Sequence, residues 1–323
     1  MSLGHPARPL GIDTCDGGIY AVDSQYVRPG LMASHLLIRS GEAAFVDVGS
    51  NDSVDHLMRA LDALGVGVAS VRFLFLTHVH LDHAGGAGRL VRELPNVQVL
   101  VHPRGLRHMI DPAKLEAGTR EVYGEERFAA LFGQIIPVPE NRIRSVADGE
   151  VIRLGGSELE IWHTEGHARH HFCLWDRSTH SVFAGDNFGI AYRELETGRG
   201  RFIFPTTTPT QFDPEPARMS IDRIMGSRPR RIFIAHYSAL ETSLGELAQT
   251  LQMELAAYVS IGQKFADRPD RRHAIHEALR AHTRERLAEH GVTDPEVALN
   301  DLLAFDLALN AAGVDHWMAN TSR

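Results

Sequence analysis

The sequence predicts an α/β fold followed by an α-helical region. Up to residue 240, short runs of β-branched and apolar residues alternate with helical patterns. Beyond residue 240, the apolar residues keep helical spacing throughout. Histidine-rich polar segments follow several of the predicted strands directly. We therefore expect a strand-rich domain over residues 1–240 and a C-terminal α-helical extension over residues 241–323.

The predicted elements follow from these local patterns. Strands are expected where apolar and β-branched runs end at Gly, Ser or a polar turn, over Ile19–Val27, Ser34–Arg39, Ala43–Val48, Val71–Leu76, Val97–Val101, Glu158–Trp162, Phe172–Trp175, Val182–Ala184 and Arg231–Ile234. Helices are expected where apolar residues recur every three to four positions, over Val54–Leu64, Arg89–Leu94, parts of 103–135, Leu244–Ala266, Arg271–Glu289 and Pro295–Ala312.

Composition excludes several classes of protein. The chain has 323 residues, twice the ~150 of a typical domain. Its net charge of −8 argues against binding to nucleic acid or to an anionic membrane. No apolar run reaches the ~20 residues of a membrane span. With only two cysteines, Cys15 and Cys173, we expect a cytoplasmic protein without a disulfide framework.

A dense cluster of metal-binding side chains follows the predicted strand Val71–Leu76. Within the segment THVHLDH, imidazole and carboxylate groups come from His78, His80, Asp82 and His83. Three further candidates, His167, Asp186 and His236, follow later strands. Five histidines and two aspartates can supply two metal sites if one aspartate bridges them. Imidazole and carboxylate without thiolate suit Zn²⁺, and also Mn²⁺ or Fe.

These residues resemble the signature of a known family. The segment from His78 to His83 matches the HxHxDH motif of the metallo-β-lactamase superfamily position by position. The later histidines and aspartate occur in the family's order, and Asp47-Val48-Gly49 resembles its early Asp-x-Gly turn. The resemblance covers residues 18–240 and implies an αββα sandwich with metals at one edge, between the sheets.

The resemblance also implies which residues hold the metals. His78, His80 and His167 would bind the first ion, Asp82, His83 and His236 the second, and Asp186 would bridge the two. We expect two divalent ions, zinc first, with manganese or iron as alternatives.

Two further side chains are expected to support the ligands. Ligating histidines need an acceptor for their other ring N–H, which favours such a role for Asp47. His171 is expected either to assist a ligand or to have an ordinary structural role.

The implied chemistry is hydrolysis by a hydroxide that bridges the two metals. Asp82 and Asp186 are expected to be catalytic, with Asp82 orienting or relaying a proton to the leaving group. True β-lactamases of this superfamily generally lack the bridging aspartate, so Asp186 argues against antibiotic hydrolysis. The closer resemblance is to the glyoxalase II and lactonase-like branch, which implies cleavage of an ester, lactone or thioester in a small-molecule substrate.

The substrate pocket is less well defined by the sequence. The long segment after Asp186 is rich in aromatic residues, and an apolar acyl pocket is expected from Phe188, Tyr192, Phe202, Phe204 and Tyr237. The alternative is that these rings only pack the loop onto the sheet. Tyr192 loosely matches the spacing of a proton-donating tyrosine in lactonases.

Three alternatives stay open at this point. On the same fold, a single Fe²⁺ could serve a reaction that resembles that of persulfide dioxygenases. The protein could also be a scaffold that keeps its metals for stability, although sites with open positions suit catalysis better. The apolar stripe of the C-terminal region, which includes Leu244, Leu247, Leu251 and Leu255, could form a homodimer interface or pack back onto the sandwich.

Overall fold

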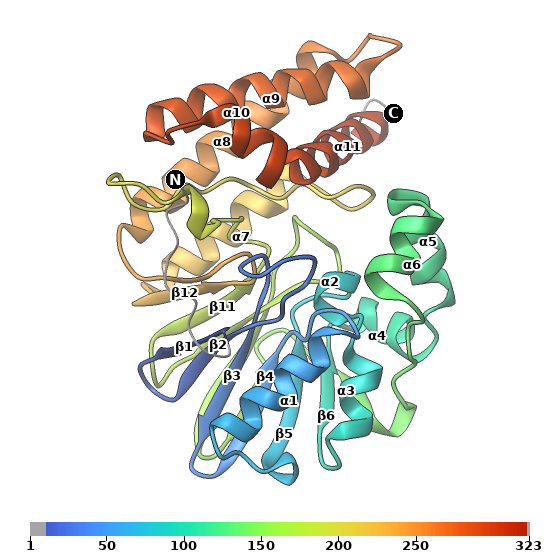
Figure 1. Cartoon of the computed structure of the whole chain (residues 1–323), viewed down its shortest axis with the longest axis vertical. Helices are drawn as coiled ribbons and strands as arrows, with labels where there is room; N and C mark the ends of the chain where they lie inside the picture. The colour runs from blue at the N-terminus through green and yellow to red at the C-terminus, as the bar shows by residue number, and fades with distance from the viewer. Residues whose placement is uncertain (1–10, 322–323) are drawn as a thin grey trace. The chain divides into compact units, whose positions relative to one another are not determined.

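The computed structural model describes residues 11–321, which form two compact units (Figure 1). Of the described residues, the first unit contains 11–163, 170–185 and 230–239. The second contains 164–169, 186–229 and 240–321. The predicted domains extend to residues 1–10 and 322–323, which lie outside the described residues. The boundary at residue 240 stays a prediction.

The first sheet has seven strands in sequence order. They are β1 (Ile12–Cys15), β2 (Ile19–Asp23), β3 (Ala33–Arg39), β4 (Glu42–Val46), β5 (Val71–Leu76), β6 (Gln98–Val101) and β7 (Ile143–Ser145). Strands β1 to β4 pair antiparallel, whereas β4 to β7 pair parallel. The carboxyl ends of β4 and β5 therefore lie at the same edge of the sheet.

The second sheet has six strands in the order β13-β12-β11-β10-β9-β8. They are β8 (Val151–Leu154), β9 (Ser157–His163), β10 (Phe172–Asp176), β11 (Ser181–Gly185), β12 (Arg231–Ile234) and β13 (Ser238–Leu240). Strands β11 and β12 pair parallel. As in the first sheet, residues that follow these two strands leave the sheet at one edge.

The two sheets share a core of aliphatic and aromatic side chains. Phe75 of β5 and Leu100 of β6 belong to the same buried cluster as Phe172, Phe183 and Phe233 of the second sheet. Fully burying each such side chain contributes about 1.5–3 kcal/mol. This shared layer of buried side chains holds the two sheets together.

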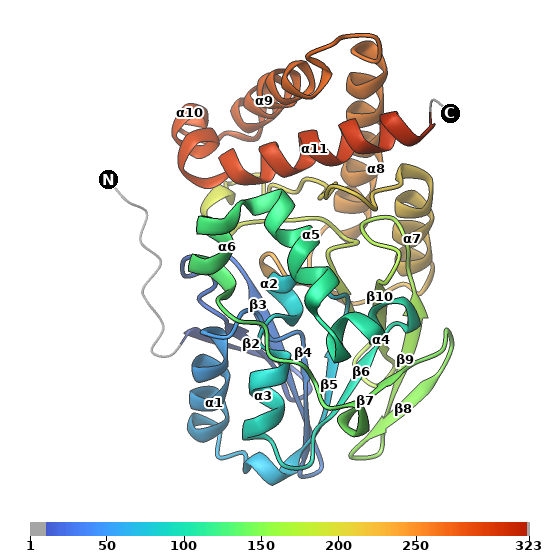
Figure 2. The same cartoon turned by 90° about the vertical axis from the view of Figure 1, so that its right-hand side faces the viewer.

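The outer face of the first sheet is covered by helices (Figure 2). Leu57 and Leu61 of α1 (Ser53–Ala63) and Leu90 of α3 (Ala87–Glu93) join the apolar face of the strands. The predicted helical stretch 103–135 contains three helices, α4 (Pro103–Ile110), α5 (Ala113–Tyr123) and α6 (Glu125–Phe132). Phe128 and Phe132 of α6 pack with Tyr26 and with Leu81, which lies between His80 and Asp82.

The second unit is mainly helical. Its helices are α7 (Pro214–Gly226), α8 (Leu244–Lys264), α9 (Arg271–His290), α10 (Pro295–Val297) and α11 (Ala304–Thr321). Leu247, Leu251 and Leu255 are buried, so the apolar stripe of α8 is covered inside the protein, whereas Leu244 is half-buried.

Two predicted elements differ from the structure by more than two residues at their C-terminal ends. The strand expected over Ile19–Val27 ends at Asp23, because Gln25 and Val27 take positive φ values of 51° and 60°. The helix expected over Pro295–Ala312 is divided by a π-helical turn at Ala298–Leu302, and α11 continues to Thr321. Both differences come from local backbone geometry that apolar spacing does not report.

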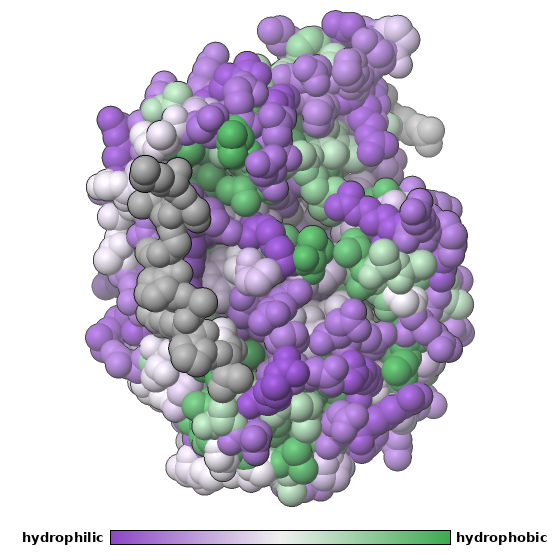
Figure 3. All heavy atoms as spheres, in the orientation of Figure 1, coloured by the Kyte–Doolittle hydropathy of each residue, from purple (hydrophilic) through white to green (hydrophobic). Residues whose placement is uncertain are grey.

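Most of the face seen in Figure 3 is hydrophilic, and its hydrophobic residues form small clusters. Among the described residues, no single helix combines the length and hydropathy needed to cross a membrane. One bent pair, Pro295–Leu302 with Ala304–Thr321, passes on length and composition alone, with 74° between its parts.

Candidate metal centre

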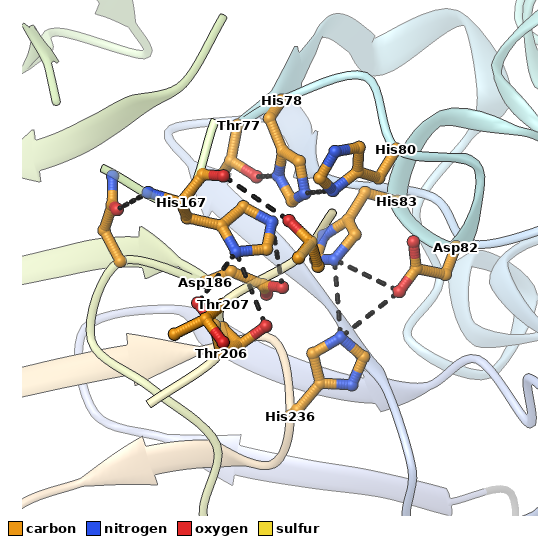
Figure 4. A network of polar contacts seen from close by, with 12 residues as sticks. Thr77, His78, His80, Asp82, His83, His167, Asp186, Thr206, Thr207 and His236 are labelled. Atoms are coloured by element: carbon orange, nitrogen blue, oxygen red, sulfur yellow. Dashed lines mark hydrogen bonds and ion pairs between the residues drawn. The ribbon is translucent and has the colours of Figure 1, made fainter. Parts of the chain in front are cut away.

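The predicted ligands lie where strands end. His78 and His80 are in the loop after β5, and Asp82 and His83 lie in the first turn of α2 (Leu81–Ala84). Asp186 directly follows β11, and His236 lies two residues after β12. Within the first unit, Asp82, His83 and His236 have ligand atoms that lie within 4.8 Å of one another (Figure 4).

The group of Asp82, His83 and His236 has the most fully defined contacts. The Nε2 atoms of His83 and His236 are 3.3 Å apart, and each lies 3.5 Å from Oδ2 of Asp82. On the other side of its ring, His236 places Nδ1 2.8 Å from the carbonyl oxygen of Leu31. A carbonyl only accepts hydrogen bonds, so Nδ1 of His236 carries the proton and Nε2 presents a lone pair.

The same reasoning applies to His83. Its Nδ1 lies 3.0 Å from Oδ2 of Asp47, and this carboxylate accepts a hydrogen bond from the Nδ1–H group. Two imidazole lone pairs and a carboxylate oxygen therefore converge with no proton between the two rings. Such an arrangement is stabilised by a cation and repulsive without one.

Asp47 is held in place by the parallel pairing of β4 and β5. Its Oδ1 accepts a hydrogen bond of 2.8 Å from the Thr77 amide, and its Oδ2 accepts one of 2.7 Å from the Thr77 hydroxyl. Asp47 has a φ of 59°, which directs the carboxylate back toward β5 and His83. Gly49 has a φ of 87°, and a Cβ there would meet Oγ of Ser53 at 2.4 Å, so this turn requires glycine.

His78 and His80 bring two further nitrogen atoms together. Nε2 of His78 lies 3.0 Å from Nδ1 of His80, while Nδ1 of His78 lies 3.1 Å from the Thr77 hydroxyl. His78 is fully buried and His80 is half-buried. The two histidines thus present different ring nitrogens toward one point.

His167 and Asp186 form the remaining pair. Nε2 of His167 lies 3.5 Å from Oδ2 of Asp186, and both side chains are buried. Nδ1 of His167 lies 3.4 Å from the carbonyl oxygen of Thr206. In this pair too, Nε2 is the nitrogen directed at a potential ion.

The spacing of these atoms fits a divalent metal. Ligands placed tetrahedrally about 2.0–2.1 Å from Zn²⁺ lie roughly 3.3–3.5 Å from one another. The separations between candidate ligand atoms are 3.0, 3.3 and 3.5 Å. The donor set, imidazole and carboxylate without thiolate, suits zinc, manganese or iron. The residues therefore fit the metal sites that the sequence predicts, while the number and identity of the ions stay predictions.

His171 packs against a candidate ligand rather than joining a ligand group. Its ring stacks on that of His78 with centroids 5.1 Å apart. A Cβ at Gly185 would meet Nε2 of His171 at 2.6 Å, so β11 passes very close to this ring. Among the described residues, no group of potential ligands includes His171.

The five aromatic residues expected to form a pocket are all buried, and they do not form one cluster. Tyr237 packs with Ala21 and Ala33 in the first unit. The other four belong to the loop 187–213 of the second unit, where the Tyr192 hydroxyl lies 3.3 Å from both carboxylate oxygens of Asp306. These are contacts of interior packing, and the role of the five residues as a substrate pocket stays a prediction.

Sequence reasoning missed residues that orient the ligands. Thr77 begins the motif segment and contacts both Asp47 and His78, so its position in the motif was a usable signal. No feature of the sequence identifies the Leu31 carbonyl as a partner of His236, because every residue type supplies a backbone carbonyl. Tyr26 is also near the site. Burial, the neighbouring Tyr123 and the charge of Asp82 raise the pKa of Tyr26, so its hydroxyl keeps its proton at neutral pH.

Comparison with known proteins agrees with this geometry. The profile of the metallo-beta-lactamase superfamily matches residues 28–236. A protein of Gallus gallus named acyl-coenzyme A thioesterase MBLAC2 is 29% identical over 189 residues, which cover 55% of this chain and 64% of that protein. An atrochrysone carboxyl ACP thioesterase of Pseudocercospora fijiensis is 24% identical over 139 residues, covering 43% of this chain and 31% of that protein.

The fold has counterparts among solved structures. The metallo-beta-lactamase family protein TTHA1429 of Thermus thermophilus superposes with a TM-score of 0.64 at 20% identity, covering 94% of both chains. That similarity extends to the C-terminal helices and bears on the fold alone. The predicted α/β fold, with two sheets, flanking helices and a C-terminal helical extension, is thus confirmed. The profile match spans most of the chain and includes every candidate ligand, with His236 at its end, and the chain belongs to the metallo-beta-lactamase superfamily.

Proposed function

We propose that this protein is a metal-dependent thioesterase that binds two divalent cations. The observation that carries the proposal is the convergence of Nε2 of His83, Nε2 of His236 and Oδ2 of Asp82. Both rings have their Nδ1 atoms engaged by acceptors, so their lone pairs are directed at a cation. Relatives named as thioesterases support the choice of a thioester among the ester-like substrates.

Two divalent cations would generate a nucleophile from water at neutral pH and polarise the carbonyl oxygen of the substrate. The protein's own residues hold and orient this chemistry. Asp47 and the Leu31 carbonyl keep His83 and His236 in one tautomer, which fixes which nitrogen faces the site. Asp186 supplies a carboxylate near His167 that we assign as the bridging ligand.

Asp82 is the residue suited to proton handling. Its side chain is 20% exposed, whereas the neighbouring His83 is fully buried, so Asp82 is the part of its group that small molecules can reach. A thiol has a pKa of about 8.5, so a thiolate leaves without strong assistance from an acid. The main role of Asp82 would therefore be to orient the attacking water and to accept a proton from it.

The complete second group of ligands argues against the iron-dependent alternative. A reaction that resembles that of persulfide dioxygenases would use one metal and leave Asp82 and His83 without a role. We also propose that the substrate is a small molecule and that the enzyme works in the cytoplasm, where its two cysteines would stay reduced. A homodimer stays a prediction.

The first test is metal content, followed by thioester cleavage. Freshly purified protein is expected to hold about two equivalents of zinc or manganese by plasma mass spectrometry. Release of free thiol from acetyl-, octanoyl- and palmitoyl-coenzyme A would then be followed with a thiol-reactive dye. Asp186→Asn is expected to lower kcat/KM by about 100-fold or more, with thermal stability largely kept.

Asp222→Asn is the matched control, because Asp222 is an exposed aspartate of α7 that accepts a hydrogen bond from Gln252. Full activity of Asp186→Asn would contradict the proposed role of Asp186. One equivalent of iron together with oxygen uptake on a persulfide would replace hydrolysis by the dioxygenase alternative. Cleavage of lactones but not thioesters would keep the metal site and correct the substrate.

A further inference from the structure

The loop that follows Asp186 is bound by the C-terminal helices of the second unit. Residues 187–213 connect Asp186 to α7, and much of this loop has no regular secondary structure. Long loops inside compact proteins are commonly functional. Residues of α9 and α11 hold the segment 202–208 at several points.

Asn310 of α11 makes the tightest set of these contacts. Its side chain is buried, with 2% exposed. Its Oδ1 accepts a hydrogen bond of 2.7 Å from the Thr207 amide, and its Nδ2 donates one of 3.1 Å to the Pro205 carbonyl. The Thr207 hydroxyl also donates to the Asn310 backbone carbonyl at 3.0 Å. One side-chain amide thus replaces the hydrogen bonds that a β-strand partner would give this segment.

Close packing and a partly buried ion pair strengthen the same attachment. A Cβ on Gly313 would come within 1.8 Å of the Thr207 carbonyl oxygen, so the helix backbone touches the loop directly. Arg286 of α9 donates a hydrogen bond of 3.2 Å to the Ile203 carbonyl and stacks over the ring of Phe202 at 4.7 Å. Glu254 of α8 pairs with Arg286 at 3.1 Å.

The residues on both sides of Thr207 contact His167. Nδ1 of His167 lies 3.4 Å from the Thr206 carbonyl and 3.5 Å from the Thr206 hydroxyl (Figure 4). The Thr208 hydroxyl donates to the His167 carbonyl at 3.4 Å. Asn187, the first residue of the loop, accepts a hydrogen bond of 3.1 Å from the His167 amide. The ring and the backbone of His167 are therefore both oriented by this loop.

We propose that Asn310 is a positioning residue for the metal ligand His167. The inference rests on the proposed function only in that His167 binds a metal. By fixing residues 205–207, Asn310 keeps the Thr206 carbonyl at Nδ1 of His167, so that Nε2 is the nitrogen presented to the ion. Partners that orient a ligating histidine typically change metal affinity 10- to 100-fold when they are lost. The C-terminal helices thereby set the affinity of the metal site to which His167 belongs.

The test compares Asn310→Ala with Asn320→Ala. Asn320 lies on the same helix, is exposed, and donates a hydrogen bond to the His316 carbonyl one turn earlier. Metal retention would be measured by competition with a chelator, and the cobalt-substituted protein would be examined by visible absorption. Asn310→Ala is expected to weaken one of the two metal sites about 10-fold or more, leaving close to one equivalent bound, with a changed cobalt spectrum. Asn320→Ala is expected to keep both ions and the wild-type spectrum.

A second variant keeps the test decisive if Asn310→Ala does not fold. Thr207→Val removes only the hydroxyl bonded to Asn310, and it is expected to shift the same metal site in the same direction by a few-fold. Unchanged affinity and cobalt spectrum in the folded variants would overturn the inference, and so would equal weakening of both sites. Because metal retention is the readout, a wild-type protein that binds two metals but cleaves no thioester overturns the proposed function alone.

Discussion

His35 is a buried histidine that the metal site does not use. It lies on β3 with 3% exposed, and its ring meets those of Phe183 and Phe233 edge-on at 5.5 and 5.1 Å. Among the described residues, its Nε2 has no hydrogen-bond partner. Burial lowers the pKa of His35 to about 3, because the charged form would lose its hydration.

This burial predicts a loss of stability in acid. The unfolded chain takes up the His35 proton below its ordinary pKa of about 6.5, whereas the folded protein does not until about pH 3. The stabilisation is therefore complete above pH 6.5 and is lost as the pH falls toward 3. Between pH 7 and pH 5, the free energy of unfolding of the wild type should fall by about 2 kcal/mol more than that of His35→Phe, because only the wild type has this linkage.

Urea unfolding of the metal-free protein at both pH values measures this difference. His273→Phe is the control, since His273 is exposed on α9. A variant whose stability falls with pH as steeply as that of the wild type would show that His35 is not the group responsible.

At the scale of elements, one buried ion pair joins the two sheets of the first unit. Arg39 at the end of β3 donates a hydrogen bond of 2.7 Å to Asp176 at the end of β10, with 8% and 0% of the side chains exposed. Burial alone would raise the pKa of Asp176. Hydrogen bonds from Ser178, Arg39 and Thr179 outweigh it and hold the pKa below its usual value. The pair therefore stabilises the fold at neutral pH and loses this effect as Asp176 is protonated in acid.

Asp176→Asn is expected to lower the free energy of unfolding by about 3 kcal/mol at pH 7, because it leaves the Arg39 charge buried without a partner. Glu158→Gln tests a surface pair, since Glu158 and its partner Arg153 have 41% and 73% of their side chains exposed. That change should stay within about 0.5 kcal/mol. Equal effects of the two substitutions in urea unfolding would refute the distinction between buried and exposed pairs.

At the scale of the whole molecule, the C-terminal helices are needed to complete the second unit. Tyr192 and Phe202 of the loop 187–213 are buried against partners on these helices, including Asp306 and Arg286. A chain ended after residue 240 would expose these aromatic rings. We expect this shortened chain to aggregate or to unfold without cooperativity, whereas a chain ended after Thr321 should behave as the full protein.

Sedimentation and thermal unfolding measure this outcome. A shortened chain that stays monodisperse, unfolds in one transition and keeps both metals would support residue 240 as a true domain boundary. The contacts of the loop favour the opposite result, because segment 186–229 belongs to the same compact unit as the C-terminal helices.

Much of the fold and of the ligand set could be predicted because the signals are local. Strands such as Val71–Leu76 have the bounds that their apolar run predicts. The ends of the elements expected over Ile19–Val27 and Pro295–Ala312 could not be predicted, because positive φ values and a π-helical turn decide where these elements end. Short strands such as β1 and β7 were missed because four or three residues carry too little pattern.

The sequence by itself determined the family, the candidate ligands and the kind of metal they suit, because these depend on residue types at short spacings within and between motifs. The tertiary structure decided which groups orient those ligands. His236 is oriented by a backbone carbonyl 205 residues away, and Asn310 bonds to a segment 103 residues away. Such contacts arise from strand pairing and helix packing over long separations, and one chain read alone carries no local pattern for them.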